Sequence, residues 1–242
     1  MSLFSKKYPV TCHTDHVEKG STFVAINGYK SNGTSFVEEA KKNGASKIIE
    51  HSKNQRITLA ALAAKALFHP EKKLKIVAVT GTKGKTTTTH IVSHILRESG
   101  IKAAHLSSHD NRILNKTEAS TLTTPPSDYL FMFLATALEQ GVTHVVMEAS
   151  SHGIEQHRLH GLSFDCIGFT NLGHDHFDFY KSMEEYFGAK LKIFNQLKKN
   201  AKAIVNFDDS WGRKITPPLI SFGTNPKASK TLVIKQNSPS GG

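Results

Sequence analysis

Apolar and polar residues alternate along this chain in blocks that predict strands and helices in turn. In the first 70 residues, two apolar runs are each followed, after a polar turn, by residues with helical spacing. The strands are expected at 22–26 and 47–50, and the helices at 35–43 and 57–68. Pro70 stops the second helix, and residues 69–73 read as a linker. Residues 1–70 are therefore predicted to form a small N-terminal α/β domain.

The alternation continues from residue 71 with longer elements. Strands are expected at 76–80, 102–106, 143–147 and 165–170, and helices begin near residues 85, 127 and 182. The first of these helices carries Ile91, Ile95 and Leu96 as apolar positions, and a polar loop leads from the strand at 102–106 to residue 123. Strands that alternate with helices favour a mostly parallel sheet with helices on both faces. Residues 71–242 are thus predicted to form a second α/β domain.

A glycine-rich turn joins the strand at 76–80 to the following helix. Gly81 and Gly84 let the backbone approach a ligand closely, and the N–H groups that open the helix point towards it. Lys85 adds a positive charge, and the Thr86 hydroxyl is a potential ligand for Mg²⁺. The turn departs from the G-x-x-x-x-G-K-[ST] pattern at Val79, which leaves a plain surface turn as the alternative. Between a strand and a helix, the turn predicts a P-loop-type phosphate site for ATP, formed by Gly81, Thr82, Lys83, Gly84, Lys85, Thr86 and Thr87.

Polar residues at the ends of two later strands extend this prediction. Glu148 follows the strand at 143–147, and the sequence His-Asp-His-Phe-Asp at 174–178 follows the strand at 165–170. Because the carboxyl ends of parallel strands meet at one edge of a sheet, both are expected near the phosphate turn. Glu148 is placed there to hold Mg²⁺, with a solvated glutamate as the alternative. For the histidines, metal ligation and a plain polar loop stay equally open, since no zinc-ligand spacing accompanies them.

A lysine interrupts the apolar stripe of the helix that begins near residue 182. The stripe has the spacing of one helix face and comprises Met183, Phe187, Lys190, Phe194 and Leu197. A lysine at such a position commonly extends its amine to water. If the amine is buried instead, its pKa falls and the neutral form can react. Lys190 is therefore a candidate functional residue, with the extended surface lysine as the alternative.

Composition narrows the class of protein. With 242 residues, 38% hydrophobic and 21% charged, the chain is typical of a folded globular protein. It has neither an apolar run of membrane-spanning length nor an N-terminal signal peptide, so a cytoplasmic location without membrane association is expected. The two cysteines, Cys12 and Cys166, predict no disulfide framework. The net charge of +11 suggests nucleic acid, but the lysines are dispersed. Attraction of anionic substrates explains this charge better.

Seven motifs, in order along nearly the whole chain, resemble those of the Mur ligases, most closely the MurE type, which acts on UDP-N-acetylmuramoyl-L-alanyl-D-glutamate. Each motif is weak alone, and together they are specific. The motifs are Thr80–Thr87, Thr123–Pro125, Met147–Gly153, Gln156–Arg158, Phe169–Leu172, Asp175–Asp178 and Tyr186–Phe194. The segment Thr22–Gly28 also resembles the UDP-binding domain of that type.

The resemblance implies a role for each matching residue. Lys85 would contact the ATP phosphates, and Thr86 and Glu148 would hold Mg²⁺. His176 and a carbamylated Lys190 would help to hold a second metal ion or the γ-phosphate. Residues 1–70 would bind the UDP-sugar and residues 71–242 ATP. The muramoyl dipeptide would be bound by Thr123, Thr124, Ser150, Ser151, Gln156 and Arg158.

The implied activity is an ATP-dependent ligase of peptidoglycan precursor synthesis. ATP would phosphorylate the D-glutamyl side-chain carboxylate, and the amine of meso-diaminopimelate or L-lysine would displace phosphate. Only small molecules are expected as partners, neither nucleic acid nor membrane is, and the protein is expected to be a monomer. Members of the family continue into a C-terminal amino-acid-binding domain, so this chain is expected to be a fragment, a truncated product or a pared-down homologue.

The chain departs from the family at three places. His13-Thr14-Asp15 stands where Asp-Ser-Arg is usual, Asn32 where aspartate is common, and Lys83 where asparagine is common. Because of the first departure, the sequence does not identify which residues would contact uridine.

Three alternative functions remain. They are another Mur-type or folylpolyglutamate-type ligase, a non-catalytic protein that binds nucleotide or UDP-sugar, and, on charge alone, a nucleic-acid binder. The pattern from Ser150 to Arg158 favours the MurE type over other ligases.

Overall fold

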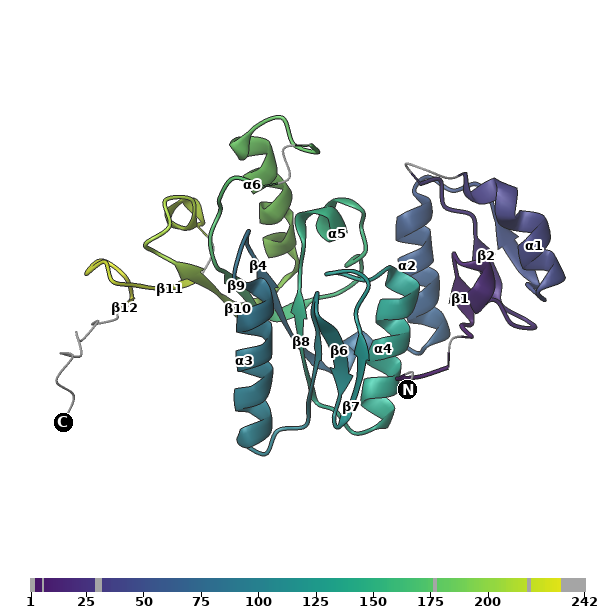
Figure 1. Ribbon diagram of the computed structural model, residues 1–242, viewed down its shortest axis with the longest axis horizontal. Helices are drawn as coiled ribbons and strands as arrows, with labels where there is room; N and C mark the ends of the chain where they lie inside the picture. The colour runs from purple at the N-terminus through teal and green to yellow at the C-terminus, as the bar shows by residue number, and fades with distance from the viewer. Residues whose placement is uncertain (1–2, 6, 29–31, 176–177, 217–218, 232–242) are drawn as a thin grey trace.

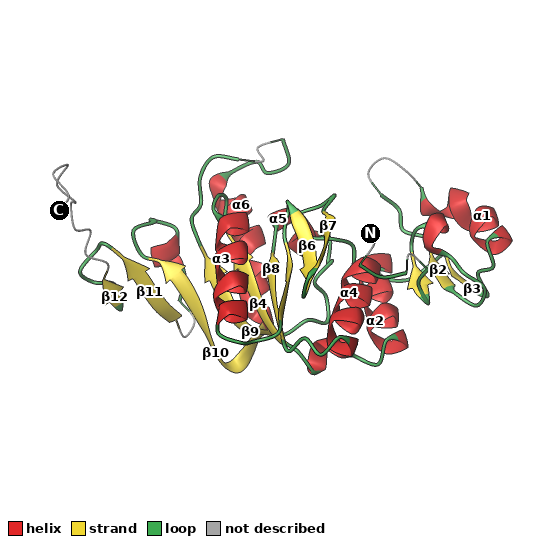
Figure 2. Ribbon diagram, turned by 60° about the horizontal axis from the view of Figure 1, so that its bottom comes forward, coloured by secondary structure: helices red, strands yellow, loops and turns green. Residues whose placement is uncertain are grey.

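The computed structural model describes residues 3–5, 7–28, 32–175, 178–216 and 219–231 (Figure 1). The molecule is elongated. A small sheet with α1 lies at one end and β12 lies at the other. Figure 2, turned by 60°, shows the same order.

The small sheet has three parallel strands in the order β1-β2-β3. Its strands are β1 (Val10–Thr11), β2 (Thr22–Val24) and β3 (Lys47–Ile49), and the helices of this part are α1 (Val37–Lys42) and α2 (Gln55–Ala66). The Asn54 side chain accepts hydrogen bonds from the N–H groups of Arg56 and Ile57. This cap starts α2 two residues before the apolar spacing does. The predicted small α/β unit is confirmed, although β1 is too short to show a periodicity.

The large sheet has nine strands in the order β12-β11-β10-β9-β4-β8-β5-β6-β7. Strand β6 is antiparallel to β5 and β7, and the other described neighbours are parallel. The strands are β4 (Lys75–Thr80), β5 (Ala103–Leu106), β6 (Asp110–Ile113), β7 (Lys116–Ala119), β8 (His144–Glu148), β9 (Phe164–Phe169), β10 (Leu197–Asn206), β11 (Leu219–Gly223) and β12 (Lys230–Thr231). The mostly parallel sheet is confirmed. Because β5 lies on one side of β4 and β9 on the other, the loop after β4 lies at a topological switch point.

Helices cover both faces of this sheet, as predicted. They are α3 (Lys85–Glu98), α4 (Ser127–Glu139), α5 (Ser151–Glu155) and α6 (Met183–Leu191). Successive side chains of a strand point to opposite faces. On β5, Leu106 belongs to the apolar cluster that contains α4, whereas the neighbouring His105 bonds to Ser93 of α3. Helices α3 and α4 therefore lie on opposite faces.

One apolar cluster crosses the boundary expected near residue 70. Helix α2 packs against α4, and Leu59 shares its buried cluster with Leu130 and Val145. The two sheets are thus joined through a common core rather than by a linker alone.

The apolar positions named for α3 do not all face the core. Ile91 and Ile95 are 52% and 56% exposed, and the helix buries Thr89 and Ser93 instead. Spacing identifies an apolar stripe, but the neighbouring elements decide which side of the helix faces the sheet. Here the side with threonine and serine packs towards β5 and β8.

Two further expectations are corrected. The predicted polar loop after β5 contains the hairpin of β6 and β7. Its turn residue Leu114 has φ of 50°, a conformation that asparagine or glycine usually adopts in such turns. The stripe around Lys190 is divided among three elements: α6 ends at Leu191, Phe194 lies in the 3₁₀ turn Lys192–Gln196, and Leu197 begins β10.

Candidate functional site: a phosphate loop beside two cavities

The loop after β4 has a backbone that only glycine permits at its first position. Gly81 has φ of 141°, and a Cβ atom there would lie 2.0 Å from Thr170 Oγ1. Gly84, with φ of 81°, is the N-cap of α3. The loop therefore presses against the end of β9 and presents the first N–H groups of α3 at the edge of the sheet.

Asn171 holds the loop from the side. Its Oδ1 accepts from the Lys83 N–H at 3.0 Å, its Nδ2 donates to the Lys83 carbonyl at 3.2 Å, and its own carbonyl accepts from the Thr82 N–H at 2.8 Å. The Lys83 side chain is exposed, so this residue takes part through its backbone. Such bracing fixes the N–H groups before a ligand arrives.

Lys85 bends back over its own loop. Its Nζ donates to the carbonyls of Gly81 at 3.1 Å and Thr82 at 2.8 Å. Burial lowers the pKa of Lys85, while the carboxylates of Glu148 and Asp175 oppose that shift. A phosphate anion would give this desolvated amine a charged partner in place of two carbonyls.

Thr86 and Glu148 meet through a third residue, Ser108. The Ser108 Oγ lies 2.8 Å from Thr86 Oγ1, and both its N–H and its hydroxyl donate to Glu148 Oε1, at 2.7 and 3.1 Å. Glu148 is 1% exposed, and within the described part of the chain no group donates to its Oε2. A buried carboxylate oxygen without a donor, close to a hydroxyl, fits a Mg²⁺ site. Sequence analysis missed Ser108, which lies in the loop between β5 and β6 with no pattern to mark it.

Lys190 is buried, 1% exposed, so the surface-lysine alternative is wrong. Its Nζ donates to the Gly81 carbonyl at 2.9 Å and lies 4.4 Å from the centre of the Tyr186 ring. Two lysines therefore share one carbonyl oxygen. Burial, and then the nearby Lys85, lower the pKa of Lys190 to about 7, against the attraction of Asp175. Much of this amine is neutral near pH 7.

Replacing Lys190 by methionine is expected to stabilise the fold most below pH 7. The pKa of Lys190 is about 7 in the folded chain against an ordinary value of 10.5 for lysine, so between these values the unfolded chain binds more protons. Wild-type stability therefore rises with pH in that window, by at most about 1.4 kcal/mol per pH unit. The advantage of Lys190→Met should shrink from pH 7 to 9 in denaturant unfolding without CO₂. A pH-independent difference would contradict the buried-amine geometry.

The predicted ligand His176 lies outside the described residues. Its neighbour Asp175 is described, and its carboxylate is close enough to act on both Lys85 and Lys190. The loop after β9 thus reaches the phosphate loop, as the parallel sheet predicts.

A second network joins Glu148 to the residues expected at the muramoyl end. Thr124 Oγ1 donates to the Glu148 carbonyl at 3.0 Å and accepts from the Ser150 N–H at 2.9 Å. Gly153 approaches so closely that a Cβ atom there would lie 2.7 Å from Thr124 Cβ. Ser151 is buried at the first turn of α5, and Thr123 directly precedes Thr124. Glu148 therefore contacts the phosphate side with its side chain and this network with its backbone.

Arg158 and Gln156 continue the network towards solvent. Arg158 donates to the Thr124 carbonyl at 2.6 Å and, through Nη2, to Gln156 Oε1 at 2.7 Å, and Arg56 of α2 donates to the same Oε1 at 3.4 Å. Burial and the positive charge of Arg56 lower the pKa of Arg158. Two guanidinium groups from distant parts of the sequence thus converge on one amide oxygen, which favours an anionic ligand.

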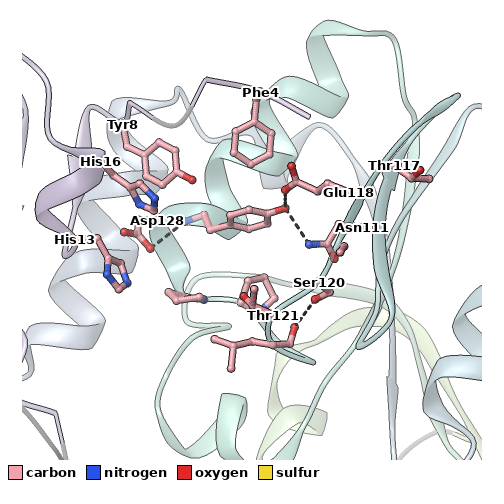
Figure 3. Close-up of a pocket in the computed structure, with 15 residues that line it drawn as sticks. Phe4, Tyr8, His13, His16, Asn111, Thr117, Glu118, Ser120, Thr121 and Asp128 are labelled. Atoms are coloured by element: carbon pink, nitrogen blue, oxygen red, sulfur yellow. Dashed lines mark hydrogen bonds between the residues drawn. The ribbon is translucent and has the colours of Figure 1, made fainter. Parts of the chain in front are cut away.

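Two cavities open beside this network. One of about 390 Å³ lies between the small sheet and α4, lined by Cys12, His13, Thr14, Ile26, Gly33, Phe36, Arg56, Leu59, Leu122, Pro126, Ser127, Gln156 and Arg158. A neighbouring cavity of about 710 Å³ lies between the N-terminal segment and the β6–β7 hairpin (Figure 3), and His13, Leu122 and Pro126 line both. Asn111 Nδ2 donates to the Tyr129 hydroxyl, which also bonds to Glu118. The cavities offer room for an extended ligand reaching from the small sheet to Gln156 and Arg158.

The fold and the loop define an α/β protein of the P-loop type, built on a mostly parallel sheet with its phosphate loop at the switch point. Residues 79–240 match the Mur ligase middle domain, and residues 8–82 match the model described as Mur ligase family, catalytic domain. The chain belongs to the Mur ligase family.

Named relatives show which type of Mur ligase the chain is similar to. The chain is 34% identical over 234 residues to a UDP-N-acetylmuramoyl-L-alanyl-D-glutamate–2,6-diaminopimelate ligase of Clostridium perfringens, covering 91% of this chain and 48% of that protein. It is 38% identical to a UDP-N-acetylmuramyl-tripeptide synthetase 2 of Oceanobacillus iheyensis, covering 88% and 48%. A solved diaminopimelate ligase superposes with a TM-score of 0.77 at 28% identity, covering 92% and 50%. The chain thus spans about half the length of the relatives it matches. Of the helices described, none is long and apolar enough to cross a membrane.

Proposed function

We propose that this chain carries the ATP-binding and muramoyl-binding parts of a ligase that adds an amino acid to UDP-N-acetylmuramoyl-L-alanyl-D-glutamate. The position of Glu148 supports this most directly, because its carboxylate reaches Thr86 through Ser108 while its carbonyl bonds Thr124. One residue thus joins the proposed ATP site to the proposed carboxylate site. The names of the relatives suggest the substrate and 2,6-diaminopimelate as the amino acid. The resemblance of the motifs leaves L-lysine as the other amino acid.

The reaction requires two anions, the substrate carboxylate and the γ-phosphate, to approach each other. The residues of the loop would reduce the repulsion between them. The D-glutamyl side-chain carboxylate attacks the γ-phosphorus of ATP, which gives an acyl phosphate and ADP. The turn from Gly81 to Thr87 would hold the phosphates through the N–H groups that Asn171 does not occupy, those that open α3, and Lys85 would neutralise charge as it develops. Thr86 and Glu148 would hold Mg²⁺, whose charge screens the phosphates.

Lys190 would contribute as a carbamate. Its neutral amine forms an N–C bond with CO₂ and releases one proton, so an uncharged group becomes an anion with two oxygens. Burial beside Lys85 favours the neutral amine that this reaction needs. The carbamate oxygens, with His176, would then hold a second metal ion or orient the γ-phosphate.

The small sheet would hold the UDP end of the substrate. His13 and Thr14, which stand in place of the usual family residues, line the cavity of about 390 Å³ together with Arg56 and Arg158. The diphosphate charge of the substrate would match these two guanidinium groups.

Phosphate transfer to the dipeptide substrate tests the proposal. ATP, Mg²⁺ and UDP-N-acetylmuramoyl-L-alanyl-D-glutamate are mixed with the protein, and hydroxylamine traps the acyl phosphate as a hydroxamate. Hydroxamate that depends on both substrates is expected. Binding of both substrates without turnover would instead indicate a non-catalytic binding protein, and ATP binding without affinity for the dipeptide would indicate another type of ligase.

Arg158→Ala is expected to weaken binding of the muramoyl dipeptide about 10–100-fold, since hydrogen bonds to charged groups contribute roughly 1.5–3 kcal/mol. ATP affinity should stay unchanged because Arg158 contacts the Thr124 side of the network. Calorimetric titration of each ligand measures both effects. An equal loss of ATP and dipeptide affinity would contradict separate subsites.

A further inference from the structure

A cluster of metal-ligating side chains lies one helical turn beyond the phosphate loop and takes no part in the proposed ligase reaction. His90 of α3, His105 of β5 and Asp110 of β6 bring their ligand atoms within 4.8 Å of one another. Asp110 Oδ1 lies 3.0 Å from His90 Nε2 and 3.2 Å from His105 Nε2. Three separate elements therefore direct two imidazoles and one carboxylate to the same point.

These separations suit one small ion. Nitrogen and oxygen ligands lie about 2.0–2.1 Å from Zn²⁺, so neighbouring ligands around a tetrahedral ion are roughly 3.3 Å apart. The distances from Asp110 Oδ1 to the two histidine nitrogens, 3.0 and 3.2 Å, are within about 0.3 Å of that ligand–ligand separation. A set of two histidines and one carboxylate is typical of divalent transition metals, whereas Mg²⁺ prefers oxygen ligands.

The surroundings orient the buried histidine. Ser93 Oγ lies 3.1 Å from His105 Nδ1, and Arg97 donates to the same Oγ. An Nδ1–H donated to Ser93 leaves the lone pair on Nε2, which faces Asp110. His105 is 2% exposed, while the side chains of His90 and Asp110 are 35% and 20% exposed, so an ion can enter from one side.

We propose that His90, His105 and Asp110 bind a divalent transition metal ion, with Zn²⁺ the best fit, and that solvent completes its coordination. The ion would tie α3 to the turn at 107–110. That turn already contacts α3 at two residues of the helix. Ser107 Oγ lies 3.0 Å from His90 Nε2, and Ser108 Oγ lies 2.8 Å from Thr86 Oγ1. The metal would therefore brace the turn that carries Ser108 without touching ATP.

Titration of the chain with Zn²⁺ tests the site. One ion per chain is expected by calorimetry, with a higher melting temperature and, with Co²⁺ as a probe, visible absorption of a low-coordinate ion. His90→Ala and Asp110→Asn should each weaken binding at least about 100-fold. Neither replaces the buried His105, and circular dichroism confirms that both variants fold.

Two variants serve as controls. His94 lies on the same helix with its side chain 63% exposed, so His94→Ala should leave Zn²⁺ affinity unchanged. Glu148→Gln should also retain the ion, because Glu148 belongs to the proposed Mg²⁺ site. Absence of stoichiometric binding, binding that survives both His90→Ala and Asp110→Asn, or binding lost in Glu148→Gln would each overturn the proposal. The three residues would then form only a hydrogen-bonded cluster.

Discussion

Lys85→Ala is expected to reduce ATP affinity and turnover by a factor on the order of 10²–10³, the range found when a donor to developing phosphate or oxyanion charge is removed. Among the described residues, the Lys85 amine bonds to two loop carbonyls, and it is held close to the site where phosphates would lie. No core contact is lost, so the melting temperature should change little. Calorimetry with a non-hydrolysable ATP analogue measures the affinity.

Lys83→Ala is the matched control for that variant. It removes the same charge from the same loop, but the Lys83 side chain is exposed and its backbone bonds to Asn171 remain. Affinity within about fivefold of wild type is expected, since an exposed charge contributes at most about 1 kcal/mol. If both variants lose the same ATP affinity, the loss comes from the general positive charge of the loop, and the proposed specific role of Lys85 is contradicted.

Lys190→Ala is expected to reduce acyl-phosphate formation by a factor on the order of 10²–10³, because the carbamate that it would carry is removed. Small carboxylates such as acetate should restore part of the activity by entering the vacated space. The hydroxamate assay measures both. Lys192→Ala, two residues on and with its side chain 60% exposed, is the control and should retain activity.

Labelled bicarbonate separates a carbamate from a structural lysine. With ¹³C-bicarbonate, wild type should give a carbamate resonance that grows as pH rises through about 7, where the amine loses its proton. The resonance should be absent in Lys190→Ala. Full activity of wild type in CO₂-free buffer without any such signal would reject the carbamate, even if the variant were inactive.

The glycine-rich loop between β4 and α3 was predictable because its signal is local. A strand, two glycines, a lysine and a helix follow each other within about a dozen residues, and each has a physical role that sequence neighbours decide. The parallel sheet was predictable for a similar reason, since alternating strands and helices leave few other arrangements. The order of the strands in that sheet then places Glu148 beside the loop.

The outward face of α3 and the roles of Ser108, His90 and Asp110 were not predictable in this way. Each depends on which element packs against which, and side-chain contacts here join residues more than a hundred positions apart, as between Thr11 and Asp128. No periodicity encodes such a pairing. The hairpin of β6 and β7 escaped notice because its strands are short and polar and its turn begins with Leu114.

Lys190 shows most clearly what the sequence determines and what only the tertiary structure decides. The sequence alone determined that a lysine stands in an apolar stripe, and it left two outcomes open: an amine in water or a buried amine. The tertiary structure decided between them, because the Gly81 carbonyl and the Tyr186 ring, from a loop about a hundred residues away and from its own helix, enclose the amine. Local sequence sets where a side chain begins and what chemistry it has. The dielectric and the partners that set its charge come only from packing.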